Sequence, residues 1–263
     1  MVNIEIPVRY GREITERDCQ SHETNLGYGA LNWTLPIDET ALVLVDCWGD
    51  FPLGSFVERA GEACKTKIRP VLEACRDLGV AVIHAPSPAW AANYPDFQYR
   101  PQPDAGTADQ SETVDWPPDG FTAEAGDFFV PRAGAEPVYS EWWKAHYPDN
   151  LKISSYVEPA GDDLVVSTGD ELHAICCERH IKHLVYAGFA TNICVLYRDY
   201  GVMAMKKRGY NIIFIRDATT AVESSETVDG LWAMRSAIFY IEIKVGVTVT
   251  TDGFLHACRA QGG

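Results

Sequence analysis

The sequence predicts an α/β protein, with one mostly parallel, six-stranded sheet covered by helices on both faces to give three layers. Three observations support this class. Short, unbroken apolar runs are typical of strands buried on both faces. Amphipathic segments with helical periodicity lie between them. Such an alternation of strand and helix favours a parallel sheet. The expected strands are residues 41–45, 80–83, 163–167, 183–187, 211–215 and 244–249.

Helices are expected between these strands. Residues 55–78 place their apolar side chains mostly on one helical face and end at Gly79. A second helix opens after Thr168 and runs to about Arg179, and a third covers residues 222–240. A further amphipathic helix follows Cys194 and is ended by Gly209, because glycine is favoured just after a helix.

Composition limits the classes of function. The net charge of −15 argues against nucleic acid or an anionic membrane as partner. No apolar run approaches the roughly 20 residues that span a bilayer, and the first residues lack the apolar stretch of a signal peptide. The eight cysteines are scattered, which indicates reduced thiols in a cytoplasmic protein.

One domain is expected from residue 41 to residue 263, preceded by an extended arm at residues 1–40 that packs on the domain or on a neighbouring subunit. Residues 91–163 form an insertion rich in proline, aspartate, glycine and aromatic residues. A connection of this length usually has a function, so we expect a lid over the pocket or an oligomer contact.

Cys194 lies where the turn after the strand at residues 183–187 becomes a helix. Thr191 or Asn192 could accept hydrogen bonds from the first free N–H groups of that helix. The helix dipole and these N–H groups favour a thiolate and could also hold an oxyanion. The alternative is that Cys194 is a small, buried apolar residue.

The segment around Cys194 resembles the signature of the isochorismatase-like cysteine hydrolases, a superfamily that includes nicotinamidases, N-carbamoylsarcosine amidase and biuret hydrolase. A second match is the strand at residues 41–45 followed by Asp46, Asp50 and Phe51, which resembles the strand that carries the superfamily's catalytic aspartate. The residues matching the first signature are Gly188, Ala190, Thr191, Cys194, Val195, Gly209, Tyr210, Asp217 and Ala218.

The resemblance implies an amidohydrolase that cleaves a non-peptide C–N bond of a small amide, carbamoyl or ureido compound through a thioester on Cys194. Asp46 would take the thiol proton, pass it to the departing nitrogen and then activate water. The backbone N–H groups of Ala190 and Cys194 would hold the oxyanion, and the peptide between Phe189 and Ala190 would be cis.

The sequence departs from the superfamily at the catalytic lysine, which usually follows the third strand. Ser167 and Thr168 stand near that position here. Lys152 and, as an alternative, Lys144 are the nearest upstream candidates. Either one of them supplies the cation from the insertion, or the chemistry proceeds without it.

Aromatic residues near the strand ends are expected to bind substrate, which indicates a flat or apolar group beside the scissile bond. His84 ends the second strand and is a candidate substrate donor or a satisfied histidine. One histidine does not hold zinc, so we predict no metal. Without a glycine-rich phosphate loop we predict no dinucleotide and no other cofactor. The expected substrate-binding side chains are Trp48, Phe51, His84, Trp90 and Tyr197.

Three alternatives remain. An isochorismatase proper would cleave a vinyl ether without this cysteine, and a catalytically silent member would only bind a small ligand or build an assembly. A thiol redox or metal protein that uses Cys176 and Cys177 is disfavoured, because adjacent cysteines chelate poorly.

The superfamily often forms dimers or tetramers, so a homo-oligomer is expected.

Overall fold

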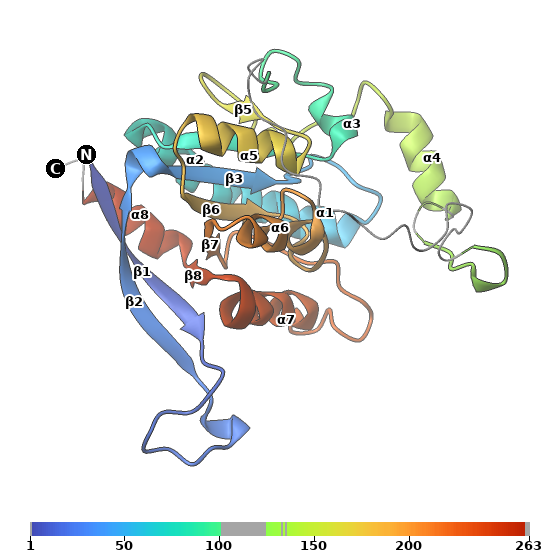
Figure 1. The fold of residues 1–263 in the computed structure, drawn as a ribbon. Helices are drawn as coiled ribbons and strands as arrows, with labels where there is room; N and C mark the ends of the chain where they lie inside the picture. Colours follow the sequence, from blue (N-terminus) through green and yellow to red (C-terminus); the bar gives the residue numbers. More distant parts are fainter. Residues whose placement is uncertain (1, 101–124, 133, 135, 261–263) are drawn as a thin grey trace, which may run out of the picture.

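The computed structural model describes residues 2–100, 125–132, 134 and 136–260, and a single sheet lies at its centre (Figure 1). The six expected strands are present and neighbour one another in the order β8-β7-β6-β3-β4-β5, all in parallel pairs. β3 and β6 are the central pair, so the residues after these two strands meet at the carboxyl edge of the sheet. The strands are β3 (Thr40–Val45), β4 (Ala81–Ala85), β5 (Leu164–Val165), β6 (His183–Gly188), β7 (Asn211–Ile215) and β8 (Val247–Val249).

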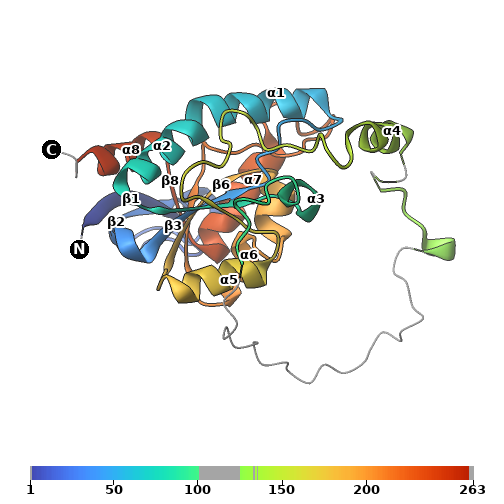
Figure 2. The same cartoon turned by 90° about the horizontal axis from the view of Figure 1, so that it is seen from above.

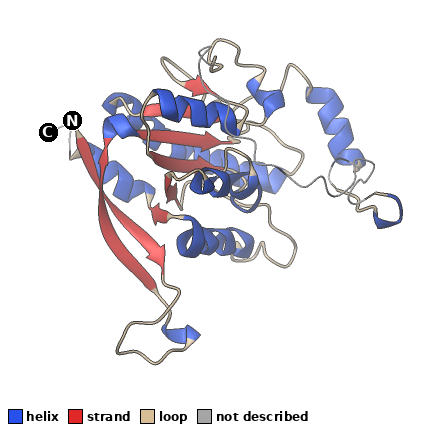
Figure 3. Cartoon of the chain, viewed as in Figure 1, coloured by secondary structure: helices blue, strands red, loops and turns tan. Residues whose placement is uncertain are grey.

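The sheet has eight strands in the described part of the chain, not six, because residues 3–36 form a hairpin where an extended arm was expected (Figure 3). β1 (Asn3–Gly11) and β2 (Tyr28–Pro36) pair antiparallel, and β1 adjoins β8. Ile4, Ile6 and Val8 are buried at alternate positions of β1. This period of two was the sequence signal for the strand.

Helices cover both faces of the sheet, as predicted (Figure 2). Leu42 and Leu44 of β3 pack in the core under α1, α2 and α8, whereas Val43 packs in the core under α5, α6 and α7. Both faces of β3 are therefore buried, which explains its unbroken apolar sequence. The helices are α1 (Gly54–Ala63), α2 (Arg69–Leu78), α5 (Gly169–Glu178), α6 (Val202–Lys207), α7 (Trp232–Tyr240) and α8 (Thr251–Arg259), with π-helical turns at Cys64–Ile68 and Ile241–Val245.

The helix expected at residues 222–240 begins ten residues later, at Trp232. Leu231, immediately before it, has a left-handed φ of 54°. The carboxylate of Glu223 accepts hydrogen bonds from the N–H groups of Ala233 and Met234, both at 3.0 Å. A carboxylate folded back from the preceding loop therefore satisfies the first turn of α7 and fixes its start.

The helix after Cys194 is also interrupted. A π-helical turn, η6 (Thr191–Val195), contains the cysteine, and α6 begins only at Val202. Between them Asp199 accepts a hydrogen bond from the N–H of Gly169 at 2.7 Å. A Cβ on Gly169 would lie 2.1 Å from the carbonyl oxygen of Asp199, so the two segments approach at backbone contact distance. This tertiary contact breaks the helix that the periodicity predicts.

The insertion expected at residues 91–163 is described only in part, since residues 101–124, 133 and 135 lie outside the described chain. α3 (Pro88–Ala91) leads into it, and a short turn at Gly126–Phe128 precedes α4 (Pro137–His146). α4 stands at one end of the molecule, beyond α3 (Figures 1 and 2). None of the described helices has the length and hydrophobicity needed to cross a lipid bilayer.

Candidate active site

Asp46 is the first residue after β3, and several polar contacts converge on it at the carboxyl edge of the sheet. It has a φ of 43° and is 1% exposed. Its Oδ1 accepts hydrogen bonds from the N–H of Ser87 at 2.5 Å, the Ser87 hydroxyl at 3.0 Å and the indole N–H of Trp48 at 3.1 Å. Its Oδ2 is buried and has no hydrogen bond of regular geometry within the described residues. One oxygen is therefore fixed, and the other remains available as an acceptor.

Cys194 approaches Asp46 from η6, after the neighbouring strand β6. Burial and then the adjacent Asp46 carboxyl raise the pKa of Cys194 to about 12, against the opposing effects of Arg198 and the N–H of Ala190. Burial also raises the pKa of Asp46, and its contact with the Cys194 thiol partly offsets this. The two groups thus interact directly, although the geometry of their contact is not that of a regular hydrogen bond.

The raised pKa of the Cys194 thiol contradicts one expectation from the sequence. The helix dipole was expected to favour a thiolate at Cys194, but burial and the neighbouring carboxylate outweigh it. The resting pair is a neutral thiol beside a carboxylate of increased basicity. Such a pair suits proton transfer during attack on a substrate, rather than a preformed thiolate.

Arg198 supplies a cation at this site that was not expected from the sequence. Its Nη2 donates a hydrogen bond to the hydroxyl of Ser87 at 2.6 Å, and its Nε lies 3.7 Å from Oδ2 of Asp46. Burial lowers its pKa, but Tyr200, Asp46 and Cys194 outweigh burial, so the net shift is upward and the guanidinium stays charged. The signal in the sequence was its position four residues after Cys194, on the same helical face.

The two lysines proposed from the sequence lie on the surface. Lys144 is exposed on α4, and Lys152 is exposed in the segment before β5. Neither is among the groups that shift the pKa of Asp46 or Cys194. The backbone of Lys152 does contribute, because its carbonyl accepts a hydrogen bond from Gly49 at 2.8 Å and so holds the loop after Asp46. The positive charge beside the pair comes from Arg198.

The backbone before Cys194 is positioned by close packing of β6 on β3. Gly188 has a φ of 120°, and a Cβ there would lie 2.0 Å from the carbonyl oxygen of Val45, so only glycine fits. The peptide between Phe189 and Ala190 is cis, as the resemblance implied. The N–H of Ala190 reaches the sulfur of Cys194 and opposes the rise in its pKa. An N–H at this place is suitably located for an oxyanion formed next to the sulfur.

Thr191 and Asn192 do not cap a helix, which was their expected role. No side chain caps η6; instead both residues bind the segment after β7. The hydroxyls of Thr191 and Thr219 lie 2.6 Å apart. The Asn192 side chain donates to the carbonyl of Val222 at 2.9 Å and accepts from its N–H at 3.2 Å. The cysteine turn is therefore fixed by contacts about 30 residues away in the chain.

Three of the aromatic residues expected to bind substrate form a stack beside Asp46. The ring of Trp48 lies 5.2 Å from Phe51 and 4.8 Å from Trp90, between centroids, and is nearly parallel to both. Trp142 of α4 continues the stack at 6.4 Å from Trp90. Tyr197 does not join it and is 69% exposed. The described part of the insertion thus adds an aromatic ring to the wall of the site.

His84 is 1% exposed at the end of β4 and is bonded within the fold. Its Nε2 lies 2.9 Å from Oδ2 of Asp163, which also forms an ion pair with Arg76 of α2. Burial lowers the pKa of His84, against the effect of Asp163. Its Nε2 is therefore bonded within the fold, whereas its buried Nδ1 has no hydrogen-bond partner among the described residues. The described residues contain no group of three or more histidine, cysteine and acidic side chains arranged for a metal.

Asp163→Asn is expected to destabilise the fold. Burial alone would raise the pKa of Asp163, but the hydrogen bonds from His84 and Arg76 lower it to about 2. A carboxyl pKa lowered this far from 3.8 contributes about 2 kcal/mol of stability above pH 4, and the contribution is lost as the pH falls toward 2. Urea unfolding of the variant at neutral pH measures this loss. The neighbouring, exposed Asp162→Asn is the control, and equal stability of both variants would contradict the assignment.

Comparison with known proteins agrees with this architecture. The family model described as the isochorismatase domain matches residues 163–251. A cysteine hydrolase from Pseudomonas syringae pv. phaseolicola 1448A has a similar structure, with a TM-score of 0.58 and 16% identity over 87% of this chain and 96% of that one. An isochorismatase family protein from Burkholderia thailandensis gives 0.51 and 17%, over 84% and 96%. No curated protein sequence matches significantly.

Residues 163–251 are thus similar to the isochorismatase domain, and the chain shares the fold of solved isochorismatase-family structures. The domain match covers the cysteine turn and the strands on either side of it, and the structural similarity extends the same fold over most of the chain.

Proposed function

We propose that this protein is a cysteine-dependent amidohydrolase, which cleaves a C–N bond of a small amide, carbamoyl or ureido compound through a thioester intermediate. The observation that carries the proposal is the convergence of Asp46, Cys194 and Arg198 at the carboxyl edge of the sheet, with the N–H of Ala190 directed at the sulfur. Nucleophile, base, cation and oxyanion donor are thereby within one buried site.

Attack begins when the substrate carbonyl carbon approaches the sulfur of Cys194. Asp46 accepts the thiol proton as the S–C bond forms, and the raised pKa of its carboxyl makes it a stronger base for this step. The carbonyl π electrons move to oxygen, and the N–H groups of Ala190 and Cys194 stabilise the resulting oxyanion.

Collapse of this intermediate breaks the C–N bond. Asp46 returns its proton to the nitrogen, which leaves as ammonia or an amine, and a thioester remains on Cys194. Asp46 then removes a proton from water as the water attacks the thioester carbon. Release of the acid product and reprotonation of the sulfur restore the resting thiol and carboxylate.

Arg198 replaces the missing lysine as the cation of the site. It faces Oδ2 of Asp46 at 3.7 Å and the Ser87 hydroxyl at 2.6 Å, and Ser87 in turn binds Oδ1 of Asp46. The arginine therefore limits the rise in the carboxyl pKa and holds Asp46 through Ser87. A guanidinium also keeps its charge when partly buried, where a lysine could lose its proton.

Arg198→Ala is expected to lower kcat/KM about 10²-fold, because it removes the charge that keeps Asp46 ionised in a buried site. Without the positive charge of Arg198 the pKa of Asp46 should rise further, so the acid limb of the pH–rate profile should also move to higher pH. Arg198→Lys should restore part of both properties. Lys152→Ala and Lys144→Ala are the matched controls, and a larger loss in either than in Arg198→Ala would return the catalytic role to the lysine.

The aromatic stack indicates the kind of substrate. Trp48, Phe51 and Trp90 offer apolar surface next to Asp46, so a compound with a flat or apolar group beside its scissile bond fits best. An ammonia-release screen of aromatic and aliphatic amides, ureas and carbamoyl compounds tests both the reaction and this preference. Turnover of a vinyl ether with no release of ammonia or amine from any compound would favour the isochorismatase-type alternative.

A further inference from the structure

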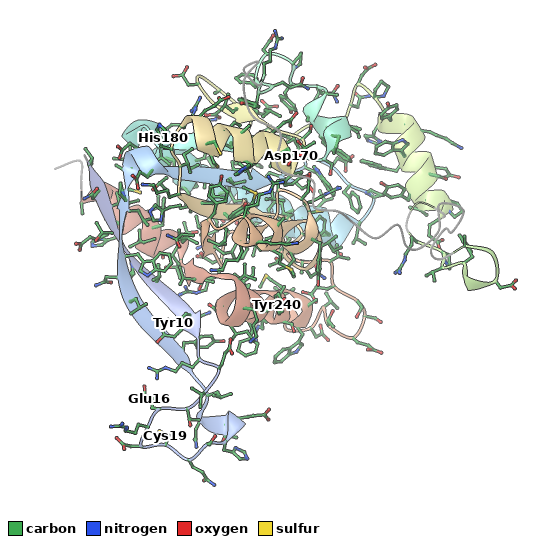
Figure 4. The ribbon with its side chains drawn as sticks, viewed as in Figure 1. Tyr10, Glu16, Cys19, Asp170, His180 and Tyr240 are labelled. Atoms are coloured by element: carbon green, nitrogen blue, oxygen red, sulfur yellow. The ribbon has the colours of Figure 1, made fainter. Side chains whose placement is uncertain are left out.

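A cavity of about 510 Å³ lies between the N-terminal hairpin and α7, and none of the candidate active-site residues lines it. Tyr10 of β1 and Tyr240 of α7 mark these two elements in Figure 4. We refer to it as the hairpin cavity. Its lining consists of Arg9, Tyr28, Arg216, Trp232, Arg235, Ser236, Ile238, Phe239 and Glu242.

The charge of the hairpin cavity is opposite to that of the whole chain. Three arginines and one glutamate line it, whereas the chain has a net charge of −15. Arg9 is compensated locally, because its Nε and Nη2 bind Oε1 of the buried Glu242 at 2.8 and 2.7 Å. Glu242 is 3% exposed, so this pair forms part of the floor of the cavity.

The other two arginines have no carboxylate in direct contact in the described part of the chain. Arg216 donates to the neutral hydroxyl of Thr248 at 3.2 Å, and burial and the charge of Arg9 lower its pKa. Arg235 lies over the ring of Trp232, with the guanidinium carbon 5.2 Å from the centroid. Within the described residues neither Arg216 nor Arg235 forms an ion pair with a carboxylate. Glu242 and Asp217 partly offset the charge of Arg216, but neither arginine is neutralised by a direct carboxylate contact, so an anion in the cavity would stabilise both.

Large rings at the hairpin cavity are exposed. Tyr28 is 49% exposed, Trp232 58% and Phe239 45%. Aromatic side chains gain free energy when an apolar surface covers them, and a flat group can stack on them. The cavity volume also lies within the range of small-molecule sites.

We propose that the hairpin cavity binds a small organic anion with a flat, apolar body, separate from the candidate active site. Arg216 and Arg235 hold the anionic group, and Tyr28, Trp232 and Phe239 contact the body.

Calorimetric titration of the full chain with benzoate and with benzamide, its neutral counterpart, tests the proposal. Benzoate should bind at least about tenfold more tightly than benzamide, since only benzoate forms charge-assisted hydrogen bonds with the arginines. Trp232→Ala and Arg235→Gln should each weaken benzoate binding about tenfold; both side chains are exposed, so the fold should persist. Lys206→Gln, an exposed charge on α6, is the matched control and should bind like the wild type.

Three results would overturn the proposal. Equal affinity for benzoate and benzamide, or no binding of either, would remove the anion site. Loss of benzoate binding in Arg198→Ala but not in Arg235→Gln would place benzoate at the candidate active site. Dissociation of an oligomer by Trp232→Ala, without benzoate binding in the wild type, would show that the surface contacts another copy.

Discussion

Cys194→Ala is expected to reduce turnover of any amide substrate by at least about 10⁴-fold, because the sulfur forms the covalent bond of the intermediate. Substrate binding and folding should change little, since the substitution removes one buried atom. The measurement is kcat together with thermal unfolding. Cys177→Ala, an exposed cysteine on α5, is the matched control and should retain full activity.

The covalent intermediate gives this prediction a second readout. Mass spectrometry of acid-quenched wild-type protein should find the acyl group of the substrate on the peptide that contains Cys194. A catalytically silent, ligand-binding member would show neither the adduct nor turnover. Near-wild-type turnover by Cys194→Ala would remove the proposed mechanism altogether.

Asp46→Asn is expected to lower kcat about 10³-fold, because the amide keeps the shape of the side chain but cannot accept the thiol proton. The substitution leaves an acceptor for Ser87 and Trp48, so the local structure should persist. Asp77→Asn, on the exposed side of α2, controls for removal of one negative charge and should be fully active.

The pH dependence follows from the same carboxyl group. Burial raises the pKa of Asp46 above its ordinary value of 3.8, so activity should fall as the pH drops through that raised value. No alkaline limb from Cys194 is expected in the neutral range, because the pKa of its thiol is about 12. The residual activity of Asp46→Asn should lack the acid limb. An acid limb unchanged in this variant would assign the proton acceptor to another group.

The raised pKa of Asp46 should also affect the stability of the fold. A carboxyl whose pKa is raised on folding stabilises the protein only at low pH, and this contribution is lost as the pH rises through the raised value. We therefore expect Asp46→Asn to unfold at a higher temperature than the wild type at about pH 7, and to lose this advantage at about pH 4.

The position of much of the candidate site could be predicted from the sequence, because residues that follow parallel strands lie at one edge of the sheet. The apolar runs before Asp46 and before the cysteine turn predicted two strands, and the structure makes them the neighbouring strands β3 and β6. Residues that follow adjacent parallel strands must meet at one edge. The encounter of Asp46 and Cys194 follows from that rule, and their catalytic roles stay predictions.

The cation and the histidine could not be found in this way. Lys144 and Lys152 were chosen by their nearness in sequence to the position of the family lysine, but nearness in sequence does not fix the direction of a side chain. Arg198 reaches Asp46 only because the pairing of β3 with β6 brings the residues after β6 beside the carboxyl end of β3. His84 was read as facing the site, and only the packing of α2 and the segment before β5 shows it bonded to Asp163.

By itself the sequence determined the parallel core and its helical layers, because hydrophobic periodicity is a local property, and the pairing of Asp46 with Cys194 was what the family resemblance implied. Only the tertiary structure decided that residues 3–36 form a hairpin on the sheet, that α7 begins at Trp232, and that Arg198 provides the charge. The hairpin and the position of Arg198 depend on contacts between segments distant in the chain, β1 with β8 and Asp46 with Arg198, and the start of α7 depends on the fold of the loop that carries Glu223. No local pattern encodes the distance between two such segments.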